Sequence, residues 1–274
     1  MFSASTAIII YIRCTAHTNT DMNNIIIVGG SSGIGLALCQ KLKDRGVINI
    51  SRTPCAVAGI TDIRADVCDV ESLEKAFEQI HKADALVYCA GMSMAAPVEC
   101  VREKDVYDLF DTNILGAIMC SKFALPLIKN SRDGRMIFVS SSASVTPIAF
   151  DSFYSASKAA LNMFAHGLRM ETGVKCTSAL VGGTQTRFSF KRSVYDDCGE
   201  YDEQVKTATS RLIKLEQNGY TAEYVAQKLV KILTAKNPPP TVTIGVKNKM
   251  MLAAYKLLPK RVALRLAKSV QIGD

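Results

Sequence analysis

The stretch "NIIIVGGSSGIGLALCQKLKDRG", residues 24–46, decides the fold because two periodicities meet in it at a cluster of glycines. Its first part is a short, β-branched run that is apolar on both faces, as strands buried in parallel sheets are. Its second part has the apolar spacing of a helix and ends at Gly46, a residue typical of helix ends. We therefore predict a strand, a glycine turn and a helix in direct succession.

The rest of the chain repeats this alternation. Further strands are expected at residues 47–52, 60–67, 84–91, 134–142, 174–183 and 241–246. Helices are expected at 72–82 with Ser72 as the N-cap, at 105–130, at 152–172, and at 221–236 before the prolines of "NPPP". Strands that alternate with helices form a parallel sheet, and ligands bind at the carboxyl ends of its strands. The predicted fold class is α/β, with one doubly wound parallel sheet and helices on both faces.

Composition limits the function classes. The 274 residues suit one large domain or two small ones, and 48% hydrophobic with 21% charged residues is ordinary for a globular protein. The formal net charge of +8 predicts anionic partners, such as a phosphorylated cofactor, an acidic substrate or a lipid surface. The sequence contains no recognised nucleic-acid-binding motif, so we expect no nucleic acid partner.

Cysteine and histidine usage bears on metals and compartment. The nine cysteines are scattered without a Cys-x-x-Cys pair, and none of the three histidines has a second ligand at metal spacing. We therefore expect no metal site. Free thiols predict a reducing compartment, so we expect a cytoplasmic protein.

The predicted boundaries divide the chain into three parts. Residues 1–21 contain an apolar run, Ala7 to Ile12, that is too short to span a membrane, and we expect a loose N-terminal extension. Residues 22–246 carry the alternating elements, and the polar, irregular segment 184–219 within them is expected to be a mobile lid. Residues 247–274 are expected to form a basic amphipathic segment.

The glycine turn "VGGSSGIG", residues 28–35, predicts a phosphate site. Glycines let the backbone approach a pyrophosphate closely, and the N-terminus of the following helix supplies N–H groups and a positive dipole. A purely structural turn is the alternative, which the position after the first strand disfavours. The residues expected to contact a dinucleotide here are Gly29, Ser31, Ser32, Gly33, Ile34 and Gly35.

The end of the second predicted strand bears on the choice of cofactor. A carboxylate there would bind the ribose hydroxyls and repel a 2′-phosphate, but this chain has Ser51 and Arg52 instead. Arginine binds phosphate through bidentate, charge-assisted hydrogen bonds. The pair therefore favours NADP (NADPH), with NAD and a merely solvated Arg52 as the alternatives.

The stretch "FYSASKAALNMF", residues 153–164, places Tyr154 and Lys158 on one helix face. An ammonium about 5 Å from a phenol would favour the phenolate by about 3 kcal/mol, roughly two pKa units. Ser141 ends the preceding strand and would reach the same edge, where its hydroxyl can bind a substrate oxygen as hydride moves. The same spacing recurs at Tyr224 and Lys228, where we expect only a structural helix pair.

These motifs, in this order, resemble those of the short-chain dehydrogenase/reductase family over about residues 25–246. The resemblance implies a single Rossmann-like domain that oxidises alcohols or reduces carbonyls with NAD(P). It implies a catalytic tetrad of Asn113, Ser141, Tyr154 and Lys158. It also implies cofactor contacts at Asp66, Val67, Ala90, Gly91, Tyr154, Lys158, Gly182, Thr184 and Thr186, beside those of the glycine turn.

The resemblance also assigns roles within the tetrad. Ser141 and Tyr154 would bind the carbonyl oxygen, and Tyr154 would supply the proton. Lys158 would lower the pKa of Tyr154 and bind the nicotinamide ribose, while Asn113 would hold the water of a proton relay. The chain departs from the family pattern at Val28, at Tyr88-Cys89, at Val181-Gly182 and in a very short second crossover, where we expect the usual helix to be lost.

The tail "KNKMMLAAYKLLPKRVALRLAK", residues 247–268, bears on the substrate. It has seven Lys or Arg and no acid, with apolar residues at near-helical spacing around Pro259. Such a segment lies on a membrane or shields an apolar pocket, and the alternative is a helix packed on the body or on a partner subunit. We therefore expect a lipid-like or steroid-like carbonyl or alcohol as substrate, with peripheral membrane contact.

Two rival functions stay open at this point. One is a reductase of 3-oxoacyl chains held by an acidic carrier protein, which the basic surface would suit. The other is a family member that binds nucleotide without turnover, and the intact tetrad argues against it. We also expect a homodimer or homotetramer.

Overall fold

The computed structural model describes residues 22–188 and 192–273, so the predicted extension 1–21 lies outside the described residues. Its main strands are β1 Ile25–Val28, β2 Val47–Ser51, β3 Thr61–Arg64, β4 Ala85–Tyr88, β6 Arg135–Ser141, β7 Lys175–Val181 and β11 Thr241–Thr243. Its helices are α1 Gly33–Leu42, α2 Val70–Glu78, α3 Glu103–Phe110, α4 Gly116–Lys129, α5 Ser152–Thr172, α6 Asp202–Gln217, α7 Ala222–Thr234, α8 Val246–Leu257 and α9 Lys260–Ile272. Four short strands form two further pairs. Strand β5 Met94–Ala95 pairs with β9 Ser193–Val194, and β8 Thr184–Gln185 pairs with β10 Tyr220–Thr221.

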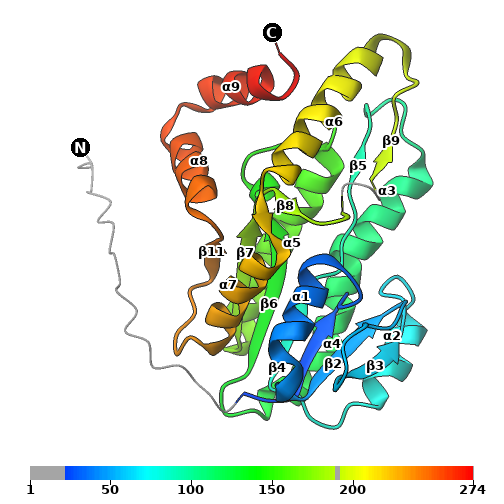
Figure 1. Cartoon of the computed structure of the whole chain (residues 1–274), viewed down its shortest axis with the longest axis vertical. Coiled ribbons are helices and arrows are strands. Elements are labelled where there is room, and N and C mark those ends of the chain that lie inside the picture. The colour runs from blue at the N-terminus through cyan, green and yellow to red at the C-terminus, as the bar shows by residue number, and fades with distance from the viewer. Residues whose placement is uncertain (1–21, 189–191, 274) are drawn as a thin grey trace.

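The main strands form one parallel sheet in the order β3-β2-β1-β4-β6-β7-β11 (Figure 1). The predicted α/β class and all seven predicted strands are confirmed. The chain leaves β1 toward β2 on one side and later crosses to β4 on the other, which creates a switch point between β1 and β4. Residues 52–60, all described, contain no helix, so the second crossover has lost its helix as predicted.

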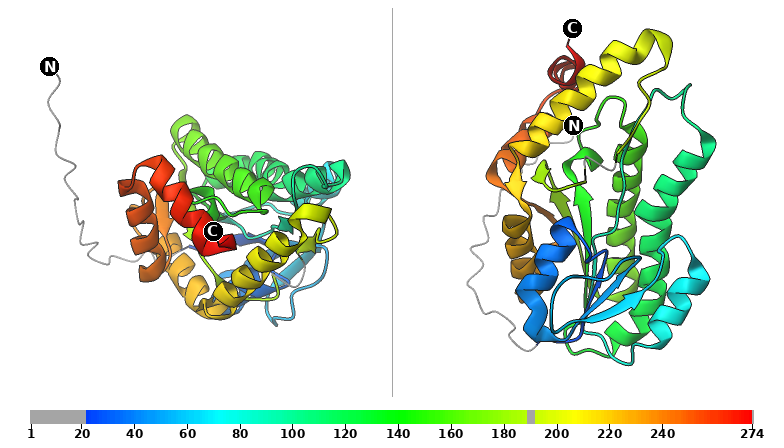
Figure 2. Two further views of the ribbon diagram at one scale, coloured as in Figure 1. Left: turned by 90° about the horizontal axis from the view of Figure 1, so that it is seen from above. Right: turned by 45° about the vertical axis from the view of Figure 1, so that its right-hand side comes forward.

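Helices cover both faces of the sheet, as Figure 2 shows from two directions. Successive side chains of a strand therefore pack alternately into one helical layer and the other. On β1, Ile26 and Val28 pack in the core that includes residues of α2, α4 and α5. Ile25 and Ile27 pack in the core that includes residues of α1 and α7. All four side chains are fully buried. This explains the doubly apolar pattern of the strand, and each such side chain stabilises the fold by about 1.5–3 kcal/mol.

The helix expected at 72–82 has its N-cap three residues earlier than predicted. Asp69 is the N-cap of α2, and its carboxylate accepts a hydrogen bond from the Ser72 nitrogen at 3.1 Å. The Ser72 hydroxyl instead accepts from the Asp66 nitrogen at 3.3 Å. Ser72 as N-cap was therefore wrong, because both residues are good caps and the upstream carboxylate closes the first turn.

The long helix expected at 105–130 contains a widened turn. Residues Asp111–Leu115 are π-helical and join α3 to α4 without a break. Such a turn inserts one extra residue and is frequent at functional sites. Hydrophobic spacing alone could not reveal it, and it carries Asn113.

The segment 184–219 is more ordered than its sequence indicates. The prediction of an irregular segment was wrong for residues 202–217, which form the 16-residue helix α6. Only Val205 and Ala208 of this helix are fully buried, so its apolar stripe is too narrow to stand out in the sequence. Residues 189–191 lie outside the described part of the chain.

The predicted tail helices flank Pro259 and extend the molecule beyond the sheet (Figure 1). Arg211 of α6 donates to the carbonyl of Ser269 near the end of α9 at 3.0 Å. Gln271 of α9 donates to the carbonyl of Pro147 at 3.0 Å, in the segment between β6 and α5. Among the described residues no helix has the length and apolar character to cross a bilayer.

Candidate active site

The first strand-to-helix turn brings glycine backbone against a neighbouring strand. Gly29 has a φ of +85°, and a Cβ built on it would lie 2.8 Å from the Ala90 nitrogen. A Cβ on Gly35 would lie 2.2 Å from the carbonyl oxygen of Gly29. Neither position has room for a side chain, so the backbone itself forms the surface at the start of α1. These residues fit a pyrophosphate held at a helix N-terminus.

Asn49 supports this turn, and sequence reasoning missed it. Its side chain is buried within β2, and its Oδ1 accepts from the Gly30 nitrogen at 2.8 Å. Its Nδ2 donates to Asp62 at 2.7 Å and to the Ser51 hydroxyl at 2.8 Å. The signal in the sequence was an amide inside the apolar strand "VINIS", because a buried amide must find partners.

The end of β2 presents Arg52 rather than Ser51. The Ser51 hydroxyl donates to the Thr53 carbonyl at 2.6 Å and accepts from Asn49, so both of its functions are used within the chain. The Arg52 guanidinium is 78% exposed and lies 3.8 Å from the Asp66 carboxylate. An exposed pair at that distance contributes little, so Arg52 is available to an anionic ligand beside Asp66.

The other predicted cofactor residues lie along the same carboxyl edge. A Cβ on Gly33 would lie 3.5 Å from the side chain of Thr186, so the β7 side closes over the glycine turn. Thr184 donates to the Gly182 carbonyl at 2.9 Å. Val67 packs against Gly116 at the start of α4. Ser31, Ser32 and Ile34 lie in the turn and first residues of α1, with partly or fully exposed side chains.

Gly91 joins the cofactor end of the site to the chemical end. A Cβ on this residue would lie 3.2 Å from Asn113 Oδ1 and 3.3 Å from Lys158 Nζ. The structure therefore brings two members of the predicted tetrad to the end of β4, beside the switch point. A flat ligand crossing Gly91 fits this arrangement, because no side chain of that residue separates it from the amide and the ammonium.

Asn113 is fully buried and bonded within the chain. Its Oδ1 accepts from the Met92 nitrogen at 2.8 Å, and its Nδ2 donates to the Met92 carbonyl and to the Ser157 hydroxyl, each at 2.9 Å. Both amide protons are thus used. The side chain can accept one further hydrogen bond at Oδ1, but it cannot donate to a relay water in this arrangement.

Ser141 and Tyr154 meet at the same edge. Ser141 is the last residue of β6, and its hydroxyl oxygen accepts from the Ala143 nitrogen at 3.1 Å. Tyr154 lies in the first turn of α5, and the Ser141 hydroxyl lies close enough to lower the pKa of the Tyr154 phenol, although burial has the larger, opposite effect. A carbonyl oxygen placed at this pair can accept from both hydroxyls.

Lys158 lies one turn further along α5 with its side chain buried. Its ammonium donates to the Val139 carbonyl at 3.1 Å and lies 5.7 Å from the centroid of the Tyr154 ring. Burial lowers the pKa of Lys158 to about 8, because the charged form loses hydration, while the nearby Cys89 thiol opposes this shift.

The pKa of Tyr154 differs from the sequence expectation. Burial raises this pKa well above that of a free phenol, and the Ser141 hydroxyl opposes the shift only in part. The expected lowering by Lys158 was therefore wrong for this structure, because loss of hydration has the largest effect on the pKa of Tyr154 and Lys158 is not among the groups that shift it. Tyr154 stays protonated at neutral pH, which is the form that a proton donor needs.

A buried polar cluster borders Tyr154 and was missed. Arg192 donates to Ser93 at 2.9 Å and to Glu216 of α6 at 2.9 Å. Ser93 donates to the carboxylate of Asp151, where α5 begins, at 3.1 Å. Burial raises the pKa of Asp151 to about 6, although Arg192 and Ser93 pull it down. The cluster ties α6 to the helix that carries Tyr154. Across the described residues, no three His, Cys, Asp or Glu side chains gather as metal ligands.

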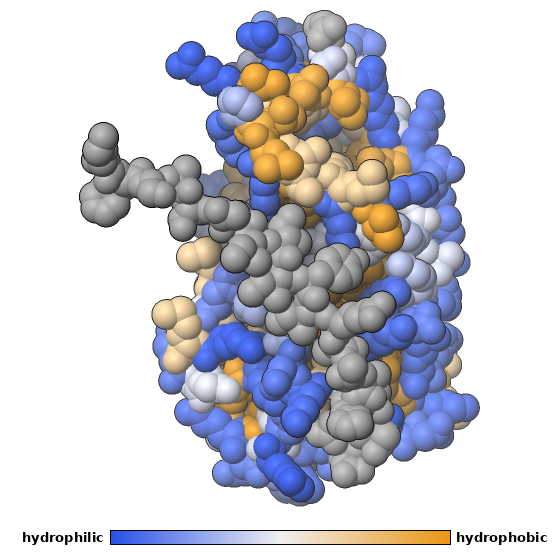
Figure 3. All heavy atoms as spheres, turned by 90° about the vertical axis from the view of Figure 1, so that its left-hand side faces the viewer, coloured by the Kyte–Doolittle hydropathy of each residue, from blue (hydrophilic) through white to orange (hydrophobic). Residues whose placement is uncertain are grey.

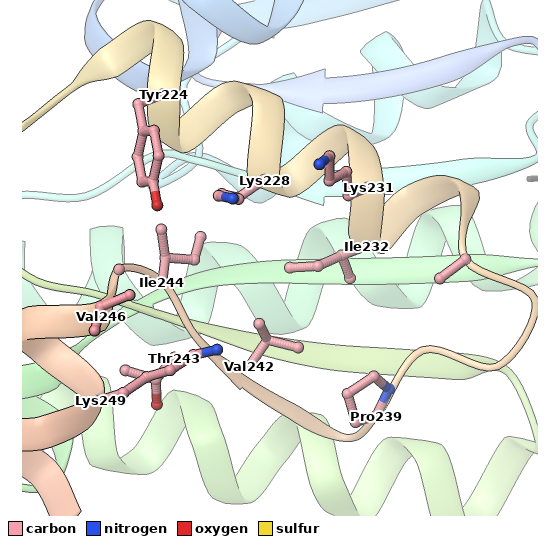
Figure 4. Close-up of a pocket in the computed structure, with 12 residues that line it drawn as sticks. Tyr224, Lys228, Lys231, Ile232, Pro239, Val242, Thr243, Ile244, Val246 and Lys249 are labelled. Carbon is pink, nitrogen blue, oxygen red and sulfur yellow. The ribbon is translucent and has the colours of Figure 1, made fainter. Parts of the chain in front are cut away.

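The second Tyr-x-x-x-Lys pair lies on α7, at a different place in the fold. Tyr224 stacks on Tyr220 with 4.7 Å between ring centroids, and Lys228 Nζ lies 4.9 Å from the centroid of Tyr224. Both side chains line a pocket of about 280 Å³ between α7, β11 and α8 (Figure 4). The pocket contains no glycine turn and no strand-end serine, and its lysines are Lys228, Lys231 and Lys249.

Known proteins share this fold and much of this sequence. The family of short chain dehydrogenases matches residues 23–194. A 3-ketodihydrosphingosine reductase of Bacteroides thetaiotaomicron is 29% identical over 245 residues, which cover 85% of this chain and 91% of the relative. An NADPH-dependent 1-acyldihydroxyacetone phosphate reductase of Schizosaccharomyces pombe is 33% identical over 61% of this chain and 62% of its own.

A solved structure gives the same architecture. A short-chain dehydrogenase from Streptomyces avermitilis superposes with a TM-score of 0.76 at 22% identity, covering 90% of this chain and 96% of that chain. This similarity concerns the fold, whereas the family match covers well over half of the sequence. The chain belongs to the short-chain dehydrogenase/reductase family and is an oxidoreductase that acts on CH–OH and carbonyl groups.

Proposed function

We propose that this protein is an NADPH-preferring reductase of an apolar, lipid-like carbonyl compound. The observation that carries the proposal is the neighbouring Ser141 and Tyr154 side chains beside a buried Lys158, at the end of the sheet that also holds the glycine turn. Proton donor and phosphate cradle thus lie at one edge of one sheet. A Tyr-x-x-x-Lys pair with a purely structural role would need neither the strand-end serine nor the glycine turn.

The geometry supports the following roles in a reduction. A bound nicotinamide supplies the hydride for the carbonyl carbon. The Ser141 and Tyr154 hydroxyls bind the carbonyl oxygen, and Tyr154 gives its proton to that oxygen as negative charge develops on it. Lys158 places a positive charge beside the resulting tyrosinate and lies close enough to Gly91 to contact a ligand there. Asn113 positions the Met92 backbone and Ser157 instead of donating to a water.

The preference for NADPH rests on Arg52. It is the exposed cation at the end of β2, and a strand-end carboxylate that would repel a 2′-phosphate is missing at this position. The yeast relative named above as NADPH-dependent supports the same preference. Asp66 lies 3.8 Å from Arg52, so a bound 2′-phosphate would compete with this carboxylate for the guanidinium.

The apolar substrate class rests on the surroundings of Tyr154. Apolar side chains pack together on this side of the site, and the ring of Phe188 lies 6.0 Å from the ring of Tyr154. The members of this cluster are Met92, Met94, Ala96, Val101, Val106, Leu109, Phe110, Phe153, Tyr154 and Tyr195. Apolar surroundings of the proton donor favour a long-chain or polycyclic ketone over a sugar. Relatives named as reductases of 3-ketodihydrosphingosine and of acyldihydroxyacetone phosphate support this class.

The test is NADPH and NADH oxidation with a panel of carbonyl compounds. The panel contains 3-ketodihydrosphingosine, a steroid ketone, a 3-oxoacyl chain on a carrier protein and a short ketose. We expect turnover with one of the two free apolar ketones and a higher kcat/KM with NADPH. Turnover with the carrier-bound chain alone would establish the rival reductase, and no turnover with any carbonyl would establish a nucleotide-binding protein without catalysis.

Location and assembly are separate proposals. The cysteines that the structure describes are free, and four of them are buried, which supports a reducing compartment such as the cytoplasm. The homodimer or homotetramer expected from the sequence stays a prediction. Light scattering after size exclusion measures the subunit number directly.

A further inference from the structure

The two tail helices, α8 and α9, expose several large apolar side chains to solvent. On α8, Val246, Met250 and Leu257 lie within a narrow arc of the helix surface and are 65%, 68% and 86% exposed. On α9, Leu266 and Val270 lie one turn apart and are 52% and 73% exposed. Figure 3 shows apolar side chains gathered at this end of the molecule. We call these five side chains the tail face.

The charge around the tail face has one sign. Seven Lys or Arg and no acid lie between residues 246 and 272. With the described residues, none of the seven forms an ion pair within 4 Å. Apolar residues flanked by unpaired cations fit the interface of a bilayer that contains anionic lipids.

A second copy of this chain fits the tail face poorly. A two-fold contact would place the same surface against itself, so seven basic side chains of one copy would meet seven of the other. No acid on either tail would offset that repulsion. Burying unpaired charges of one sign is costly, whereas lipid phosphates neutralise them.

The pocket of Figure 4 adjoins the tail face. Val246 belongs to both, since it lines the pocket and begins the apolar arc of α8. Lys228 and Lys231 lie on the α7 side of this pocket and Lys249 on the α8 side. Apolar side chains, including Val242 and Ile244, line the space between them. Three ammonium groups around an apolar floor suit a lipid phosphate whose glyceride part lies on the floor.

We propose that the tail face and the three-lysine pocket dock this protein on an anionic phospholipid bilayer, with a lipid phosphate held by Lys228, Lys231 and Lys249. The docked surface is tied to the active site. The side chain of Gln271 in α9 donates to the Pro147 carbonyl and accepts from the Ala149 nitrogen at 2.6 Å. This segment lies between Ser141 and Tyr154 in the chain, so the docked helices contact the loop that joins the strand of Ser141 to the helix of Tyr154.

Flotation of the full-length protein with vesicles tests the proposal. We expect binding to phosphatidylcholine vesicles that contain about one third phosphatidylserine or phosphatidic acid, weak binding to pure phosphatidylcholine, and loss of binding in high salt. Met250→Glu/Leu257→Glu and Leu266→Glu/Val270→Glu should each reduce the bound fraction at least tenfold. Met163→Glu/Met170→Glu is the matched control, because these methionines are 71% and 86% exposed on α5 and the change in charge is the same.

A second pair of variants tests the pocket. Lys231→Glu/Lys249→Glu should weaken vesicle binding at least tenfold, whereas Lys82→Glu/Lys129→Glu, on exposed lysines of other elements, should weaken it about threefold or less. Circular dichroism and NADPH binding, measured on every variant, show that the fold is kept. Docking does not depend on the proposed substrate, so these results stand even where no carbonyl is turned over.

The contrary results are equally concrete. Equal binding to neutral and anionic vesicles, equal losses in test and control variants, or no binding to any vesicle would overturn the proposal. A wild-type dimer that Met250→Glu/Leu257→Glu converts to monomers, without vesicle binding, would show that a second copy covers the tail face instead.

Discussion

The chain contains two Tyr-x-x-x-Lys pairs on helices, and their surroundings are unlike. Tyr154 and Lys158 lie at the carboxyl edge of the sheet, where Ser141 neighbours the phenol and the ammonium donates to the Val139 carbonyl. Tyr224 and Lys228 lie in an outer pocket, where the Tyr224 ring stacks on Tyr220 and the Lys228 ammonium lies over the Tyr224 ring. Spacing on a helix therefore determines which side chains are neighbours. Their protonation and reactivity depend on how deeply they are buried and on the groups that contact them.

Burial separates the two lysines most clearly. Lys158 is 4% exposed, and its pKa falls to about 8 because the charge has little solvent around it. Lys228 is only partly buried and shares its pocket with two further lysines. The first ammonium lies buried beside a phenol, whereas the second lies among other cations in an outer pocket.

The largest expected difference between the two pairs is in kcat when the tyrosine hydroxyl of each is removed. Tyr154→Phe should lower kcat for carbonyl reduction about 10³-fold, because the proton donor is lost, while NADPH binding is kept. Tyr224→Phe should change kcat less than twofold. Steady-state kinetics with fluorescence titration of NADPH measures both, and similar losses in the two variants would erase the distinction between the pairs.

Replacing the lysine of each pair should change kcat by a smaller factor than replacing the tyrosine of the active-site pair. Lys158→Met should lower kcat about 10²-fold, since the tyrosinate that forms loses its neighbouring positive charge. Lys228→Met should leave kcat within about twofold and weaken vesicle binding instead. A Lys158→Met enzyme with normal turnover would show that the buried ammonium plays no part in the reaction.

The same Lys158→Met variant has a stability signature. The unfolded chain keeps the Lys158 proton up to about pH 10.5, whereas the folded chain releases it near pH 8, so raising the pH favours the folded state of the wild type. The free energy of unfolding of the wild type, relative to the variant, should therefore rise between pH 7 and pH 10.5 by on the order of 3 kcal/mol. Urea unfolding at several pH values measures this difference, with Lys228→Met in parallel. A difference that is flat with pH would contradict the burial of a charged Lys158.

The smallest expected effect concerns the cofactor rather than the reacting groups. Arg52→Glu should raise the KM for NADPH about tenfold or more and leave kcat nearly unchanged, because the guanidinium would bind the 2′-phosphate and takes no part in the transfer of hydride or proton. Arg132→Glu, an equal charge change at an exposed position away from this edge, is the control. An unchanged ratio of NADPH to NADH efficiency would mean that another group binds the 2′-phosphate.

Strong, local patterns made the fold predictable. Ile25 to Val28 form a continuous apolar run, as a strand buried on both faces must, and Gly29 and Gly35 leave no room for side chains. The long helices α5 and α7 follow from their spacing. The helix α6 escaped prediction because it buries a narrow stripe, and the N-cap of α2 was misplaced because two adequate caps stand close together.

The site was predictable in its members and less so in its electrostatics. Tyr154, Lys158 and Ser141 lie together as expected, but the pKa of Tyr154 is raised, because burial is a property of the whole fold. Arg192 reaches Ser93 across 99 positions of sequence, a contact that no local pattern reports. Asn113 lies in a π-helical turn, and both protons of its side-chain amide are donated to groups of the same chain.

The most direct test of the central claim is a crystal structure of the complex with NADP⁺. We expect the pyrophosphate at Gly29–Gly35, the 2′-phosphate at Arg52, and the nicotinamide over Gly91 with its reactive carbon facing the Tyr154 hydroxyl. A nicotinamide bound elsewhere, or a Tyr154 side chain shielded from it by packed residues, would contradict the assignment of this pair as the reacting one.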